Sequence, residues 1–115
     1  MIYNKLVRDK IPEIIKSKGN DPITQILNPD TYKAYLDLKL SEELQEYIDS
    51  DSVEELADLV EVVYAVLKYK GVGIEEFENV RLKKANERGI FDSRICLIEV
   101  KWYYTFHDYW DVWIC

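Results

Sequence analysis

The chain has 115 residues, of which 48% are hydrophobic and 32% charged, a composition typical of one globular domain. Its net charge is −7, and proteins that bind duplex nucleic acid ordinarily carry a surplus of Lys and Arg, so we exclude that class of partner. No stretch reaches the roughly 18 apolar residues of a membrane span, and no signal-peptide pattern is present. The two cysteines have no metal-ligand spacing. We therefore expect a cytoplasmic protein without a membrane partner.

The first half of the chain predicts two helices separated by a short strand. Pro12 suits the first turn of a helix over residues 12–18. Residues 23–27 favour a short edge strand. We expect Asp30 to cap a long helix that runs to about residue 48, and a polar turn at residues 49–52 to end it.

Two more helices are predicted, over residues 53–69 and 74–87, and each ends just before a glycine, Gly71 or Gly89. Short connections between three helices favour an antiparallel bundle. The sequence thus predicts an all-α fold with at most short β elements at its edges.

Residues 101–115 form an aromatic tail within a single domain of residues 1–115. Seven of the fifteen aromatic residues lie there: Trp102, Tyr103, Tyr104, Phe106, Tyr109, Trp110 and Trp113. Their spacing suits a strand and a helix equally well. We expect the tail to bury a core or subunit contact, with stacking on a base as the alternative.

Residues 41–61 hold nine acids and no Lys or Arg. The acids are Glu42, Glu43, Glu46, Asp49, Asp51, Glu54, Glu55, Asp58 and Glu61. On a helical wheel, Glu43 and Glu55 lie at the edge of the apolar arcs of the two long helices, and Glu46 and Asp58 lie about 60° beyond. Antiparallel packing of these arcs brings the two carboxylate pairs together.

Converging carboxylates repel one another, and a bound cation removes that penalty. Ligands that are all oxygen, with no histidine nearby, favour Mg²⁺, with Mn²⁺ as an alternative. A solvated acidic surface is the competing interpretation, in which Glu55 closes a capping box with Ser52. The lack of Lys and Arg over residues 41–61 speaks against it, because solvated helix faces ordinarily mix both charge signs.

Two basic clusters flank the acids in sequence. They are Lys5, Arg8 and Lys10 near the N-terminus, and Arg81, Lys84 and Arg88, which share one stripe of the third long helix with Phe77. Each cluster suits contacts to phosphate oxygens or, alternatively, a solvated basic face paired with the acids. Cations beside an acid-lined metal site are typical of phosphoryl chemistry.

Three motifs carry a resemblance to a known family. Glu42-Glu43-x-x-Glu46 followed by Glu55-x-x-Asp58 resembles the signature of the MazG-like, all-α nucleoside triphosphate pyrophosphohydrolase superfamily, which includes phosphoribosyl-ATP pyrophosphohydrolases. Residues 3–12 and 81–89 look like the matching segments of a small-protein branch. The similarity covers about residues 2–100. Two features depart from it: the spacer between Glu46 and Glu55 is short, and the aromatic tail has no counterpart.

The resemblance implies a homodimer or homotetramer in which helices assemble into a four-helix-type bundle, with active sites near subunit contacts. It implies a nucleotide substrate that water attacks at the α-phosphorus, giving a nucleoside monophosphate and pyrophosphate. The implied Mg²⁺ ligands are Glu43, Glu46, Glu55 and Asp58, and the implied phosphate contacts are Lys5, Arg8, Lys84 and Arg88. Glu42 is expected to orient or deprotonate the water.

Three functions remain open from the sequence. The first is hydrolysis of a non-standard or surplus nucleoside triphosphate, a housecleaning role. The second is phosphoribosyl-ATP hydrolysis in histidine synthesis, which shares the chemistry at the α-phosphorus. The third is a non-catalytic helical protein that binds a partner through its tail.

Overall fold

The computed structural model describes residues 1–101, which contain four helices and no strand. The helices are α1 (Ile11–Ser17), α2 (Pro29–Ser50), α3 (Val53–Tyr69) and α4 (Ile74–Arg88). For these residues the predicted all-α class is borne out. Apart from Lys101, the aromatic tail lies outside the described residues.

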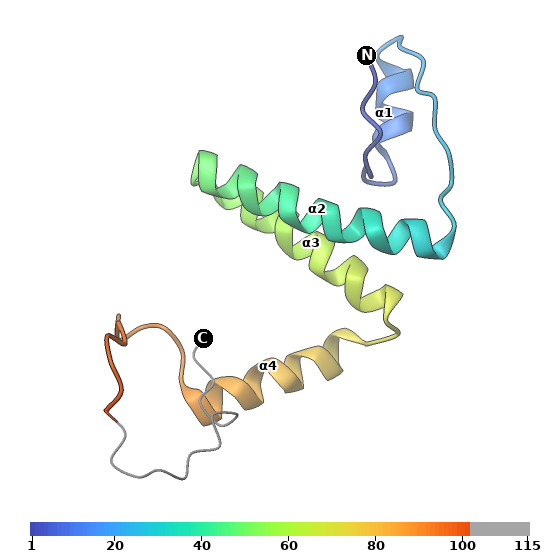
Figure 1. The fold of residues 1–115 in the computed structure, drawn as a ribbon. Helices are drawn as coiled ribbons and strands as arrows, with labels where there is room; N and C mark the ends of the chain where they lie inside the picture. The colour runs from blue at the N-terminus through green and yellow to red at the C-terminus, as the bar shows by residue number, and fades with distance from the viewer. Residues whose placement is uncertain (102–115) are drawn as a thin grey trace.

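The segment that we expected to form an edge strand, residues 23–27, is an irregular connection between α1 and α2 (Figure 1). Ile23 and Ile26 are each 95% exposed. A strand needs a neighbour to pair with its backbone, and within residues 1–101 no other strand is present to supply one. The strand prediction was therefore wrong.

Both ends of α2 differ by a few residues from the prediction. Asn28, not Asp30, is the N-cap: its side chain accepts a hydrogen bond from the Thr31 backbone N–H at 2.9 Å, and Pro29 follows at the first helical position. The helix continues to Ser50, and Asp51 ends it in the left-handed conformation at φ 54°. The turn between the two long helices is correspondingly short.

Helices α2 and α3 pack against each other as an antiparallel hairpin (Figure 1). Leu36 of α2 lies in the seam and is only 1% exposed. Tyr32, at the start of α2, makes an edge-on ring contact with Tyr69 at the end of α3, with 6.1 Å between ring centroids. This hairpin is the scaffold that carries the predicted acids.

Helix α4 contacts α3 but not α2, and it diverges from the hairpin after the turn that follows Tyr69 (Figure 1). Among the described residues Leu36 is the only buried hydrophobic side chain. One copy of residues 1–101 therefore does not enclose a bundle core, and the three-helix antiparallel bundle stays a prediction.

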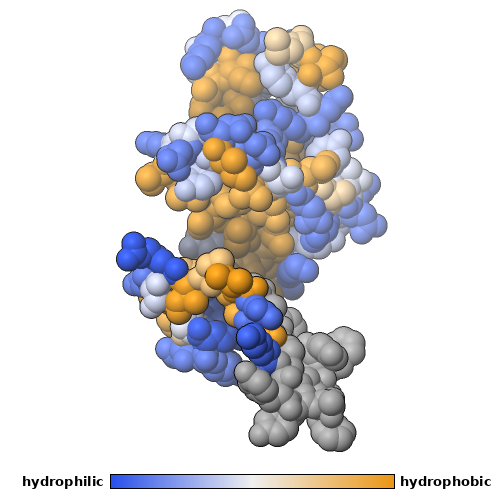
Figure 2. Space-filling view, turned by 60° about the vertical axis from the view of Figure 1, so that its left-hand side comes forward, coloured by the Kyte–Doolittle hydropathy of each residue, from blue (hydrophilic) through white to orange (hydrophobic). Residues whose placement is uncertain are grey.

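A stripe of apolar side chains on α3 is open to solvent. It consists of Val53, Leu56, Val60 and Tyr64, which recur at the three- and four-residue spacing of one helical face. On α2, Leu44 and Ile48 are also exposed. Figure 2 shows broad hydrophobic areas on the molecular surface between hydrophilic ones. No helix in residues 1–101 combines the length and apolar character that crossing a bilayer requires.

Candidate metal centre

Three predicted metal ligands converge across the hairpin. Carboxylate oxygens of Glu43 from α2 and of Glu55 and Asp58 from α3 all lie within 4.8 Å of one another. They meet because Glu43 lies seven residues before the end of α2, and Glu55 and Asp58 lie in the first two turns of α3. The short turn at Asp51 and Ser52 brings these two stretches alongside each other.

Glu43 is the most buried polar residue of the described chain, with an exposure of 6%. The helical wheel placed Glu43 at the edge of the apolar arc, and the structure buries it between the two helices. One of its oxygens, Oε2, is buried without a hydrogen-bond partner, and so is Oε2 of Glu55. A buried, unpartnered carboxylate oxygen is costly, so the two atoms mark a position where a cation would be stabilising.

The predicted fourth ligand, Glu46, is exposed and lies outside the three-residue set. Its carboxyl nevertheless neighbours both Glu43 and Glu55. Burial raises the pKa of Glu43 above its ordinary value, and the Glu46 carboxyl raises it further. The pKa of Glu55 is raised by the same two causes, and the negative charges of Asp58 and Glu43 add to them. The acids thus behave as a mutually repelling group.

The structure does not contain the capping box between Ser52 and Glu55 that was the competing interpretation. Ser52 is the N-cap of α3, but its side chain makes no capping hydrogen bond. Its hydroxyl instead donates to Glu54 at 2.7 Å, which lowers the pKa of Glu54. Ser52 therefore bonds to Glu54 and not to Glu55, and the Glu55 carboxylate lies in the acidic cluster.

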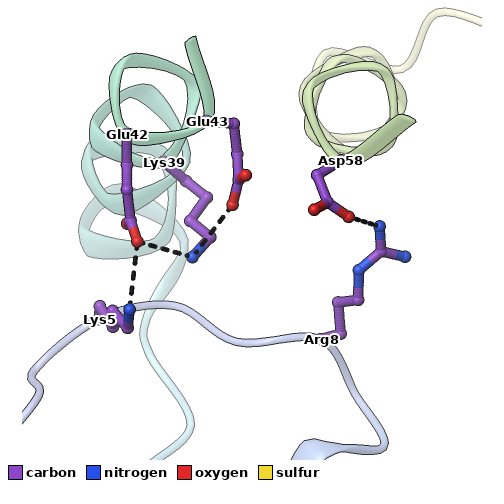
Figure 3. A network of polar contacts seen from close by, with 6 residues as sticks. All are labelled: Lys5, Arg8, Lys39, Glu42, Glu43 and Asp58. Atoms are coloured by element: carbon purple, nitrogen blue, oxygen red, sulfur yellow. Dashed lines mark hydrogen bonds and ion pairs between the residues drawn. The ribbon is translucent and has the colours of Figure 1, made fainter. Parts of the chain in front are cut away.

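Lysine 39 is a member of the site that the sequence reasoning missed. Its ammonium lies 3.3 Å from Glu42 Oε1 and 3.4 Å from Glu43 Oε1, and its side chain is only 17% exposed (Figure 3). Lys39 lies two positions before residues 41–61, the stretch that lacks Lys and Arg. The spacing of three and four residues from Lys39 to the two acids was the available signal.

Glu42 lies beside the cluster, between two lysines. Lys5 Nζ is 3.2 Å from the same Glu42 oxygen that Lys39 approaches (Figure 3). Burial alone would raise the pKa of Glu42, but the hydrogen bond from Lys5 and the charge of Lys39 outweigh it, and the pKa is lowered. Glu42 is consequently ionised and already an acceptor of hydrogen bonds.

Of the four predicted phosphate-binding cations, two reach the acids within one chain. Lys5 contacts Glu42, and Arg8 Nη2 donates to Asp58 Oδ1 at 2.6 Å. Lys84 and Arg88 belong to α4, which diverges from the hairpin and has no contact with α2. A single copy of the described chain therefore does not gather all four cations.

These contacts define the charge of the centre. Five carboxylates gather there: Glu42, Glu43, Glu46, Glu55 and Asp58. Three cations, Lys5, Arg8 and Lys39, contact three of them. With all groups ionised, five negative charges against three positive charges leave −2, which one divalent ion would balance. The donor set is all oxygen, as hard divalent ions prefer, so these residues fit Mg²⁺.

Comparison with known proteins leaves the family open. No protein-family model matches the chain, and no solved structure matches it. Over 48 residues the chain is 46% identical to an uncharacterized protein of Mycolicibacterium smegmatis, a match that covers 42% of this chain. The matched part is about half of that protein's length, 49%.

Proposed function

We propose that the protein is a Mg²⁺-dependent nucleoside triphosphate pyrophosphohydrolase that acts on a non-standard or surplus nucleotide. The observation that carries the proposal is the convergence of Glu43, Glu55 and Asp58 around buried carboxylate oxygens that have no partner. A hydrolase that cuts a polyanion needs this combination of acids for metal and nearby cations for phosphate.

Glu43, Glu55 and Asp58 would hold Mg²⁺, with Glu46 at the edge of the site. When bound, the ion supplies positive charge to the phosphate oxygens. The residues themselves position the reactants: Lys5 and Arg8 hold phosphate oxygens, and Glu42 accepts a hydrogen bond from the attacking water. Because its pKa is lowered, Glu42 is a weak base and is better suited to orienting the water than to deprotonating it.

In the proposed reaction, water oxygen forms a bond to the α-phosphorus, and the bond from that phosphorus to the oxygen bridging the β-phosphorus breaks. The products are a nucleoside monophosphate and pyrophosphate, and the proton of the water passes to solvent. Phosphoribosyl-ATP contains the same bond. It is therefore the alternative substrate, with histidine synthesis as the alternative pathway.

We further propose that the protein works as a homodimer or homotetramer in the cytoplasm. The support is the exposed apolar stripe of α3 together with the near absence of buried hydrophobic side chains in residues 1–101. Two hairpins that pack through this stripe would form a four-helix bundle with an enclosed core. A second copy would also offer a further α4, with its own Lys84 and Arg88, as a source of phosphate contacts.

The decisive test is product identification with a nucleotide panel that includes phosphoribosyl-ATP, in the presence of Mg²⁺. We expect pyrophosphate and a monophosphate rather than orthophosphate. Glu43→Gln and Asp58→Asn should each lower the rate about 100-fold, since even the loss of a group that only supports a metal ligand costs about 10–100-fold. Glu54→Gln is the matched control, because Glu54 neighbours Glu55 but bonds to Ser52.

Two outcomes would contradict the proposal. One is that no nucleotide in the panel is hydrolysed. The other is that Glu43→Gln hydrolyses as fast as the wild type. Either result would favour the non-catalytic helical interaction protein.

A further inference from the structure

The N-terminal arm, defined as residues 3–10, crosses both helices of the hairpin at the acidic centre. Lys5 binds Glu42 of α2, and Arg8 binds Asp58 of α3 (Figure 3). Helix α1, which follows the arm, has no contact with α2, α3 or α4. Within residues 1–101, these two ion pairs are thus the polar contacts that tie the beginning of the chain to the hairpin.

Both ion pairs are exchangeable. The Lys5 and Arg8 side chains are 44% and 56% exposed, so water and salt compete with their contacts. Exposed ion pairs of this kind contribute little individually. The two ion pairs place the arm against the acids, and because each is weak, another cation can displace it.

Arg8 and the proposed metal ion compete for the same carboxylate. Asp58 Oδ1 accepts the guanidinium at 2.6 Å, while Asp58 also belongs to the set that converges with Glu43 and Glu55. Arg8 is drawn to the cluster as a whole, since Glu61 and Glu43 also attract it. A divalent ion among these acids would oppose each of those attractions.

We propose that the N-terminal arm is a cationic latch on the acidic centre, released when a divalent ion takes Asp58. Without the ion, Arg8 and Lys5 neutralise Asp58 and Glu42. With the ion, Arg8 loses its partner and becomes able to bind an anionic phosphate oxygen. This inference rests on the proposed metal site and describes how that site is regulated.

Exchange of partners couples the two ligands. A metal ion on Asp58 releases Arg8 toward phosphate, and a phosphate on Arg8 releases Asp58 toward the metal ion. Because coupling between two sites is reciprocal, each ligand strengthens the binding of the other. When nucleotide is absent, the arm should lower the affinity for the metal ion, and this affinity can be measured directly.

The first experiment titrates the full-length, nucleotide-free protein with Mg²⁺ by calorimetry. Arg8→Gln should bind Mg²⁺ about threefold more tightly than the wild type, as expected for loss of one exposed ion pair. Lys10→Gln is the matched control, because it removes one positive charge from the same arm. Its affinity should change by less than about 1.5-fold, since long-range attraction between exposed charges is screened.

The second experiment follows the arm of the wild-type protein directly. Trypsin cleaves after Arg8 only when the arm is accessible, whereas cleavage after Lys18, in the exposed turn that follows α1, serves as the internal reference. Saturating Mg²⁺ should raise the ratio of the two cleavage rates about threefold. The same addition to Glu43→Gln should leave the ratio unchanged.

The outcomes separate the latch from the metal site. If Mg²⁺ binds to the wild type and not to Glu43→Gln, but Arg8→Gln binds with wild-type affinity and the cleavage ratio stays constant, the latch is overturned and the metal site stands. If Lys10→Gln tightens binding as much as Arg8→Gln does, the general loss of one positive charge from the arm accounts for the effect, and the latch is also overturned. If no Mg²⁺ binds at all, both proposals fail.

Discussion

The guanidinium of Arg8 and the carboxylate of Asp58 form an ion pair of 2.6 Å between residues that are 50 positions apart in the chain. With the contact from Lys5 to Glu42, it places the basic N-terminal segment directly on the acids of the hairpin (Figure 3). Two clusters of opposite charge that lie far apart in sequence thus form one centre.

Glu43→Gln should stabilise the protein when no divalent ion is present. The substitution replaces a buried carboxylate, whose Oε2 has no partner, with a neutral amide of the same shape. Such a group costs about 1–3 kcal/mol, partly offset here by the contact to Lys39, so we expect the free energy of unfolding to rise by about 1 kcal/mol. Urea denaturation with a chelator present measures it.

The same variant should lose its advantage when Mg²⁺ is added. An ion that binds only the folded state stabilises the wild type in proportion to the logarithm of its concentration. Glu43→Gln should show a small response or none. Equal stabilisation of both proteins by Mg²⁺ would contradict the assignment of Glu43 as a ligand. Lower stability of the variant than of the wild type in chelator would contradict the free-energy cost assigned to the buried Glu43 carboxylate.

The stability of the metal-free protein should fall as pH rises above the ordinary carboxyl pKa of 4.5. The pKa values of Glu43 and Glu55 are raised in the folded state, so the folded chain holds protons that the unfolded chain has lost. Their stabilising contribution is complete below pH 4.5 and is lost as the pH rises through the raised values. Glu42, with a lowered pKa, acts in the opposite sense below pH 4.5.

Urea denaturation at several pH values between about 4.5 and 7 tests this sign. In chelator, the wild type should lose stability over this range more steeply than Glu43→Gln, which lacks one of the two groups. Mg²⁺ should reverse the trend for the wild type, because the ion binds the ionised carboxylates in competition with protons. If the free energy of unfolding of the wild type varied with pH in parallel with that of Glu43→Gln, Glu43 would be excluded as the source of the pH dependence.

Replacement of Lys39 by Met should move the acidic limb of the hydrolysis rate to higher pH. Lys39 helps to lower the pKa of Glu42, so without it the carboxylate that accepts the water protonates at a higher pH. The rate in the acidic range should then fall several-fold, whereas the rate at high pH changes less. Lys33→Met is the control, because Lys33 forms an equivalent pair with Asp37 on the same helix, outside the acidic centre.

The helices were predictable because their ends carry local signals. Gly71 and Gly89 follow α3 and α4 as expected, and Pro12 lies in the first turn of α1. Convergence of Glu43 with the acids of α3 was also predictable, because spacing along a helix fixes the face of each residue. The missed features depend on other information. Asn28 and Asp30 both flank Pro29, and residue type alone does not say which of them caps the helix. The spacing of three and four residues allows Lys39 to reach Glu42 and Glu43, but spacing alone does not fix the direction of a long, flexible side chain.

Periodicity also does not say which chain covers an apolar face. The apolar arc of α3, to which Leu56 and Val60 belong, was predicted to pack in an antiparallel bundle, yet Val60 is 45% exposed in one copy, where α4 diverges from the hairpin. The direction of α4 depends on the backbone of the connection at residues 70–73, which hydrophobic spacing leaves undetermined. A partner copy of the hairpin is the proposal that would reconcile the pattern with the exposure.

Val60→Glu should therefore dissociate the protein into single chains. Burying a glutamate in a contact between hairpins carries the desolvation cost of a charge, whereas the isolated hairpin exposes this position and tolerates it. The matched control is Val80→Glu on α4, the same substitution at a site that is 53% exposed. Sedimentation equilibrium should give the wild type and Val80→Glu a multiple of the 13.7 kDa chain mass, and Val60→Glu the single-chain value. Unchanged mass for Val60→Glu would remove the α3 stripe as the contact, and equal dissociation by both variants would show that the assembly does not depend on the hairpin alone.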